Sequence, residues 1–261
     1  MAVGSQPAIV VPALLLVPAA WFGLVAMGLQ GPPGRMVALL ALPPVSTYFD
    51  SLNAVALLGF PAGLWAAVPM VLARALVLAL LTGLTVESLE AGRVGLAGLR
   101  RGLRAWPTVA LAGLLGLGLM VLGSAILPFL GPGFGFLGSI LTLVAAVFLF
   151  GYAPAAAVRG GRGIREDLRL GMRAAMMPGS RHFLFSMLYV FVSLPLMVAL
   201  APEGSTITVN PAFGTWVYAL AAAVVHLGFL GAFAFRWMAA EPLLPEPAAR
   251  APRGRARGAG R

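Results

Sequence analysis

Long runs of apolar residues separated by short polar connections dominate the hydropathy pattern of this 261-residue chain. Each run holds about 20 residues, enough to cross the ~30 Å hydrocarbon layer as a helix. Helix is the expected state because a lone span must satisfy its backbone hydrogen bonds internally. The pattern predicts an all-α, polytopic membrane helix bundle with six transmembrane helices, at residues 9–29, 65–86, 107–127, 136–158, 182–201 and 215–235. Because no basic stretch precedes residues 9–29, we expect a retained span there and not a cleaved signal.

Residues 36–64 are apolar only in patches, and Pro43, Pro44, Asp50 and Pro61 interrupt them. We expect an outer-surface or re-entrant helix at about 46–59, capped by Ser46 or Thr47. Its expected apolar side consists of Phe49, Leu52, Ala56 and Phe60. The alternative is a seventh crossing, which would place the N-terminus outside.

Composition agrees with this pattern, since 60% of residues are hydrophobic and 10% are charged. A soluble domain has roughly a quarter charged residues. All 18 basic residues are arginine, against 8 acidic ones, and this bias together with much Ala, Gly and Pro is typical of a GC-rich bacterial genome. The absence of cysteine excludes disulfides, thiolate nucleophiles and cysteine-based metal centres.

Arginines gather in the connections after the second and fourth spans and in the C-terminal tail. Basic residues near span ends are retained in the cytoplasm. The prediction is therefore a multi-pass protein of the bacterial cytoplasmic membrane, with residues 1–241 as one membrane domain and both termini cytoplasmic. Residues 242–261 are expected to form a disordered, Arg-rich cytoplasmic tail, because the segment 248–261 lacks apolar periodicity.

An internal repeat pairs residues 99–105 with residues 168–174, at an offset of 69 residues. Each copy, of the form Leu-Arg-x-Gly-(Leu/Met)-Arg-Ala, precedes a predicted pair of spans, so we expect two amphipathic cytoplasmic arms. In each arm an apolar stripe lies opposite the arginines. The stripe of the first arm consists of Leu96, Leu99, Leu103 and Trp106. That of the second arm consists of Ile164, Leu168, Met172 and Ala175. Such helices lie in the headgroup plane.

Four arm arginines are candidate contacts for anionic headgroups: Arg100, Arg104, Arg169 and Arg173. Each arginine near an anionic leaflet contributes on the order of 1 kcal/mol. The alternatives are that the arms only fix topology or that they dock an acidic partner. Membrane lipids are thus the expected partners, with a protein partner or homo-oligomer also possible and no nucleic acid expected, since the tail lacks aromatic residues for stacking.

The paired arms and the outer segment 48–58 resemble the six-helix membrane domain of the glycerophosphoryl diester phosphodiesterase membrane-domain type and its stand-alone bacterial relatives. The phosphodiesterase active site belongs to a separate barrel domain that this sequence lacks. The resemblance therefore implies a membrane-embedded accessory role and transfers no catalytic residue.

The sequence contains only weak candidates for a catalytic site. The two histidines lie in different predicted spans, no predicted span contains a carboxylate, and Glu166 and Asp167 sit where Arg165 and Arg169 can neutralise them. Without lysine there is no phosphate-binding loop of the Gly-x-x-x-x-Gly-Lys type. The run Pro178-Gly179-Ser180-Arg181-His182 only superficially resembles those of lipid phosphatases, and Ser139 with His226 lacks an intramembrane protease motif. We expect no enzyme, no catalytic residue, no metal and no cofactor.

The best mid-membrane site candidate combines Arg74 and His226, which lie at similar depth in their predicted spans. An arginine at the bilayer centre costs ~2.5–3.5 kcal/mol, so it should face the bundle interior or water. Arg74 either bonds carbonyls freed by the Pro69 kink or binds an anionic lipid or solute, and on the second reading Arg74→Leu should fold at least as stably. The sequence predicts a non-enzymatic accessory or lipid-associated protein, with a permease or transporter subunit as the alternative.

Overall fold

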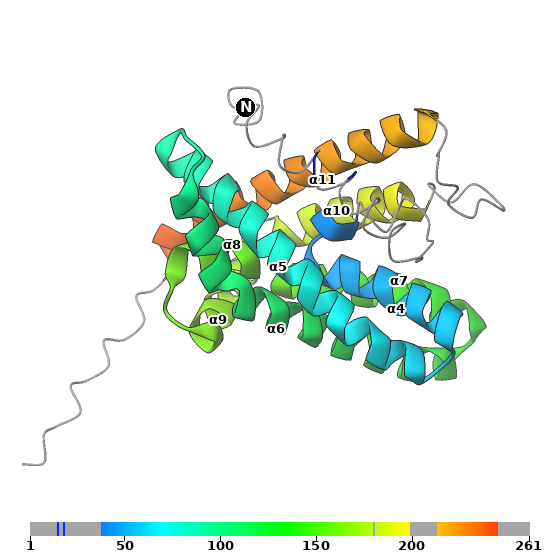
Figure 1. Ribbon diagram of the computed structural model, residues 1–261. Coiled ribbons are helices and arrows are strands. Elements are labelled where there is room, and N and C mark those ends of the chain that lie inside the picture. The colour runs from blue at the N-terminus through cyan, green and yellow to red at the C-terminus, as the bar shows by residue number, and fades with distance from the viewer. Residues whose placement is uncertain (1–14, 16–17, 19–37, 180, 199–212, 245–261) are drawn as a thin grey trace, which may run out of the picture.

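The computed structural model describes residues 15, 18, 38–179, 181–198 and 213–244. The predicted first span, apart from residues 15 and 18, and almost all of the tail lie outside the described residues. The described chain is all-α, as predicted, and Figure 1 shows its elements. They are η2 (Ala38–Leu40), α4 (Pro43–Leu58), α5 (Ala62–Ala91), α6 (Leu96–Ile126), η3 (Leu127–Leu130), α7 (Pro132–Phe150), α8 (Ala153–Gly160), α9 (Ile164–Ala175), α10 (His182–Val198), α11 (Phe213–Ala240) and η4 (Glu241–Leu243).

Four stretches of the described chain are long and apolar enough to cross a membrane: Ala62–Ala91, Leu96–Leu130, Leu137–Gly160 and Trp216–Leu243. They cover the second, third, fourth and sixth predicted spans. The fifth predicted span corresponds to α10, which is apolar but has only 17 residues within the described part. The chain is thus an integral membrane helix bundle, while the count of six crossings stays a prediction.

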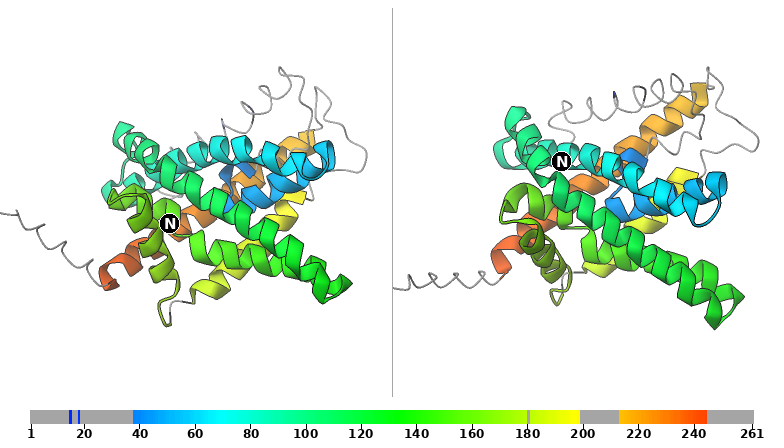
Figure 2. Two further views of the ribbon diagram at one scale, coloured as in Figure 1. Left: turned by 90° about the horizontal axis from the view of Figure 1, so that it is seen from below. Right: turned by 60° about the horizontal axis from the view of Figure 1, so that its bottom comes forward.

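Helices α5 and α6 are antiparallel neighbours that form the centre of the bundle, with α10 and α11 on one side of α5 (Figures 1 and 2). Their close approach depends on glycine. A Cβ added at Gly102 of α6 would lie 2.5 Å from the carbonyl oxygen of Ala79 on α5, and Gly83 and Gly98 are equally crowded by backbone. At Gly118, further along the same helix, an added Cβ would have no neighbouring atom within 4 Å. Small residues permit such helix contacts in lipid.

Helix α4 corresponds to the predicted helix at 46–59, but it begins three residues earlier and packs on α5, α6, α7 and α10. Its first half is buried, and Leu42 is its N-cap, so the predicted caps were wrong. Ser46 and Thr47 lie inside the helix, where Ser46 Oγ donates to the Pro43 carbonyl and Thr47 Oγ1 to the Gly113 carbonyl of α6. At 16 residues, α4 is about 24 Å long, less than the ~30 Å that a crossing needs.

The predicted apolar side of α4 was also only partly right. Phe49 is buried, whereas Leu52, Ala56 and Phe60 are exposed. The buried side instead carries Asp50, which is fully buried although it is charged. Together with the buried Ser46 and Thr47, Asp50 interrupts the apolar pattern on the buried side of α4.

The two copies of the repeated sequence occupy different structural contexts. The first copy is part of α6, which continues without a break through Pro107 into the apolar span. The second copy is the separate helix α9, and a turn with Gly179 at φ +76° follows it before α10 begins. The expected first arm is therefore the end of a long helix and not an independent one in the headgroup plane.

Most of the apolar stripe predicted for the first arm is exposed, whereas Trp106 is half-buried and its Nε1 donates to the Leu72 carbonyl of α5. Leu96 and Leu103 are 72% and 57% exposed, and the buried positions are Gly98, Gly102 and Ala105, which face α5. Leucines on this end of α6 thus lie on the outer surface of the bundle, where lipid would contact them. In α9 the predicted stripe packs into the bundle instead, since Leu168 and Ala175 are buried, Met172 is half-buried and only Ile164 is exposed.

Candidate functional site

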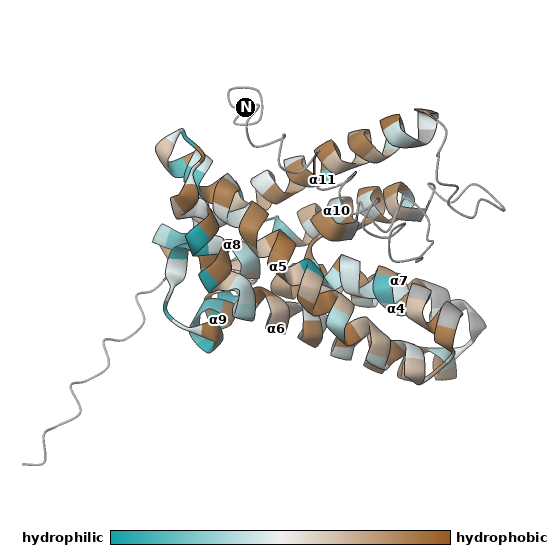
Figure 3. Ribbon diagram, viewed as in Figure 1, coloured by the Kyte–Doolittle hydropathy of each residue, from teal (hydrophilic) through white to brown (hydrophobic). Residues whose placement is uncertain are grey.

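Charged side chains of the described chain concentrate at one end of the bundle. This end comprises the C-terminus of α5, the N-terminus of α6, α8, α9 and η4, and it is the most hydrophilic region in Figure 3. Arg74 and Asp50 lie on α5 and α4 away from this end, and Arg181 and Arg236 belong to the segments of α10 and α11. We call the charged end the arginine end.

Two glutamates of the arginine end hold three arginines in one ion-pair network. Glu90 of α5 pairs with Arg101 of α6 and with Arg159 of α8, the latter at 2.7 Å between Nε and Oε1. Glu241 of η4 pairs with Arg159 and, at 3.3 Å, with Arg162. The network joins four elements far apart in sequence. Because its members are partly exposed, each pair contributes only ~0–1 kcal/mol to stability.

A third glutamate orders the start of α6. Glu87 is buried, and its Oε2 accepts hydrogen bonds from the backbone N–H of Gly95, at 3.0 Å, and of Gly98, at 2.7 Å. These donors belong to the N-terminus of α6, which lacks a side-chain cap of its own. A carboxylate at a helix N-terminus also interacts favourably with the helix dipole. The three glutamates thus serve structural contacts inside the protein.

The four candidate arginines of the arms stay outside this network. Arg100 and Arg104 of α6 and Arg169 and Arg173 of α9 are all exposed, and within the described residues none of them forms an ion pair. Helix α9 packs on α6, α7 and α8 through Leu168 and its buried neighbours, so its arginines project from a docked helix. The structure therefore separates arginines that hold the fold together from arginines that present positive charge outward.

Within the described residues Asp167 forms no ion pair with Arg165 or Arg169, so the expected neutralisation was wrong. Asp167 is buried, its Oδ1 lies against Gly160, and burial raises its pKa to about 6. Arg162 and the backbone of Arg162 and Gly163 partly offset this cost. The described residues include no group of three or more metal-ligating side chains around this carboxyl or elsewhere.

Arg74 has an acidic partner that the sequence interpretation missed. Its Nη2 lies 3.0 Å from Oδ1 of Asp50, and the two side chains are 9% and 0% exposed. Neither alternative considered for Arg74, carbonyls freed by the Pro69 kink or an anionic ligand, included this pair, because Asp50 lies in α4, outside every predicted span. A lone acid and a lone arginine in otherwise apolar segments were the signal that could have suggested the pair.

His226, the proposed neighbour of Arg74, belongs to an aromatic cluster between α10 and α11. Its ring lies edge-on to Tyr189 at 6.0 Å between centroids, and it is 1% exposed. His182 stacks on Tyr152 at 4.0 Å, and its Nε2 lies 3.1 Å from the Phe148 carbonyl oxygen. Ser139 Oγ donates to the Gly135 carbonyl within its own helix. These contacts are structural, and they give neither the phosphatase-like nor the protease-like interpretation any support.

No family model, no curated protein and no solved structure matches the chain.

Proposed function

We propose that this chain is a non-enzymatic, lipid-associated protein of the bacterial cytoplasmic membrane whose arginine end binds anionic headgroups. The positive-inside rule places that end in the cytoplasmic leaflet. The resemblance to the six-helix phosphodiesterase membrane domain belongs to the same proposal and agrees with an accessory role.

The observation that carries the proposal is the division of the arginines. Arg101, Arg159 and Arg162 are paired with glutamates, whereas Arg100, Arg104, Arg169 and Arg173 are exposed on two docked helices. Arginines needed only for topology would not have to be held on well-packed helices. Guanidinium groups bind phosphate through planar, bidentate hydrogen bonds, which suits them to lipid phosphates.

The exposed leucines of α6 support the same placement. Leu96, Leu99 and Leu103 share one end of the helix with Arg100 and Arg104, and all are exposed. An exposed helix surface that combines leucine and arginine is typical of the boundary between hydrocarbon and headgroups, where arginine side chains reach toward the headgroups. The permease alternative rested on Arg74 as an anion site, and Asp50 as its partner weakens that support.

The test uses the purified full-length chain in mild detergent with added phosphatidylglycerol or phosphatidylcholine. The wild type should gain thermal stability from phosphatidylglycerol and much less from phosphatidylcholine. A variant with the four exposed arm arginines changed to Gln should lose most of this preference, since each contributes on the order of 1 kcal/mol near an anionic surface.

A matched control changes four tail arginines, Arg250, Arg253, Arg255 and Arg257, to Gln and so removes the same net charge. The proposal expects the control to keep the preference. Equal loss in both variants, or no preference in the wild type, would show that net charge alone or topology alone explains the arginines.

A further inference from the structure

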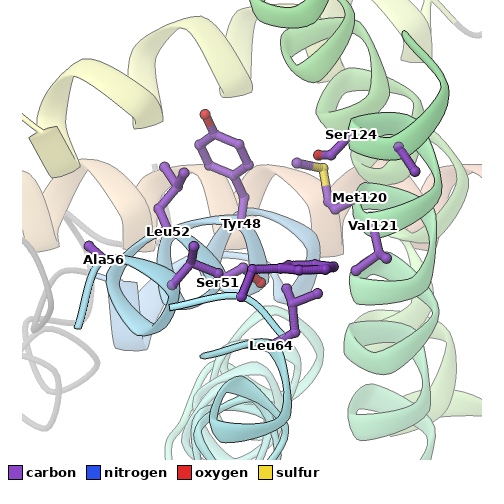
Figure 4. A pocket seen from close by; sticks show the side chains of 11 residues that line it. Tyr48, Ser51, Leu52, Ala56, Leu64, Met120, Val121 and Ser124 are labelled. Atoms are coloured by element: carbon purple, nitrogen blue, oxygen red, sulfur yellow. The ribbon is translucent and has the colours of Figure 1, made fainter. Parts of the chain in front are cut away.

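A groove of about 520 Å³ lies on the bundle between α4, the beginning of α5 and the end of α6 (Figure 4). In Figure 4, Leu52 and Ala56 of α4 face Met120, Val121 and Ser124 of α6 across the opening. The groove is lined by Tyr48, Ser51, Leu52, Val55, Ala56, Phe60, Leu64, Met120, Val121, Ser124 and Ala125. None of these side chains is charged.

The groove lies far from the arginine end. Twenty helical residues separate Arg104 from Ser124 on α6, which at 1.5 Å per residue is about 30 Å, the thickness of the whole hydrocarbon layer. With Arg104 near one headgroup layer, Ser124 lies near the other. Along α4, from Tyr48 to Ala56, the groove extends about 12 Å, comparable to the ~15 Å depth of one leaflet.

Its surroundings are apolar and open. Leu52 and Phe60 on its walls are 50% and 74% exposed, and Leu122 and Ile126 beside it on α6 are 57% and 52% exposed. The polar groups are three hydroxyls, and that of Ser51 already donates to the Thr47 carbonyl. A surface of this kind has nothing to hold a charged solute, whereas a flexible hydrocarbon chain fits its length and its chemistry.

We propose that the groove binds one acyl chain of a phospholipid from the leaflet opposite the arginine end. One lipid cannot occupy both sites, because the sites are a full hydrocarbon thickness apart and a lipid spans one leaflet. The groove site therefore goes beyond the headgroup binding proposed above, and either can fail without the other. Its selectivity is for the chain and not for headgroup charge.

The experiment measures phosphatidylcholine retained on the purified full-length chain after extensive detergent washing, by native mass spectrometry. Phosphatidylcholine is chosen because the arginine end does not favour it. The wild type should retain one molecule. Ser124→Trp, which fills the groove, should lower the retained fraction at least tenfold, whereas Leu122→Trp, on the same helix but outside the groove, should leave it unchanged.

Thermal unfolding of both variants checks that they fold. Loss of the lipid in both variants, or no retained lipid in the wild type, would overturn the proposal. A third measurement tests a different occupant, the predicted span at residues 9–29. Because the chain has no cysteine, Ser124→Cys can be combined with single cysteines in that span, and rapid disulfide formation would show that the span itself fills the groove.

Discussion

Removing one member of the Arg74–Asp50 pair should destabilise the bundle strongly. The Asp50 side chain is fully buried and 3.0 Å from the guanidinium, so Arg74→Leu would leave a buried carboxylate without its cationic partner. Breaking a buried pair in this way costs ~3–5 kcal/mol. This reverses the expectation from sequence that Arg74→Leu folds at least as stably.

The double variant Asp50→Leu with Arg74→Leu should behave differently. Replacing both charges by apolar groups removes the desolvation penalty along with the attraction, and such replacements are often neutral or stabilising by ~1–4 kcal/mol. The double variant should therefore be more stable than either single variant. The coupling between the two positions should reach several kcal/mol.

Unfolding in mixed micelles, followed by circular dichroism and tryptophan fluorescence, measures these differences. Trp106 is a suitable reporter because its Nε1 donates to the Leu72 carbonyl, close in sequence to Arg74. Single variants as stable as the wild type, or losses that add up in the double variant, would refute the argument that the two charges depend on each other.

Three further predictions follow from packing, titration and topology. Gly102→Ala should destabilise the bundle by ~1–3 kcal/mol in the same unfolding assay, because the added Cβ meets the backbone of α5. Gly118→Ala should be neutral or slightly stabilising, because nothing lies near its Cβ position. Equal effects of the two substitutions would contradict the close contact between α5 and α6. Burial raises the folded-state pKa of Asp167 to about 6, so the free energy of unfolding should increase as pH falls from about 7 to about 4. Asp167→Asn should remove that increase. A variant with the same pH profile as the wild type would exclude this carboxyl as its source. Reporters fused after Gly92 should report the cytoplasm and those at Gly131 the outside, and the opposite result would invert the proposed orientation.

The class of the fold and most helix positions were predictable from sequence, because a 20-residue apolar run has few alternatives in a membrane. The sides through which the helices contact one another were not predicted. Spacing alone placed the stripe of Leu96, Leu99 and Leu103 on a separate helix in the headgroup plane, whereas it lies on the exposed side of a long helix that packs on α5. In a membrane the leucine side can face lipid, and the contact with α5 is made by Gly98 and Gly102 because glycine lets two backbones approach.

The candidate site was predictable only in part for a similar reason. The exposed arm arginines follow from helical spacing, which is local information. The partners Glu90 and Glu241 come from segments that the chain brings together only when it folds, 151 residues apart in sequence. Asp50 was overlooked since α4 is too short and too interrupted by proline to be recognised as part of the core.

Binding of anionic headgroups by the arm arginines is the core of the proposed function. Its most direct measurement is the number of phosphatidylglycerol molecules that stay bound to the full-length chain in native mass spectrometry, compared at equal protein and lipid concentration. The wild type and the variant with four tail arginines changed to Gln should retain the same number, and the variant with Gln at positions 100, 104, 169 and 173 should retain fewer. Equal retention by all three proteins would contradict the claim and leave the arm arginines with a role in topology alone.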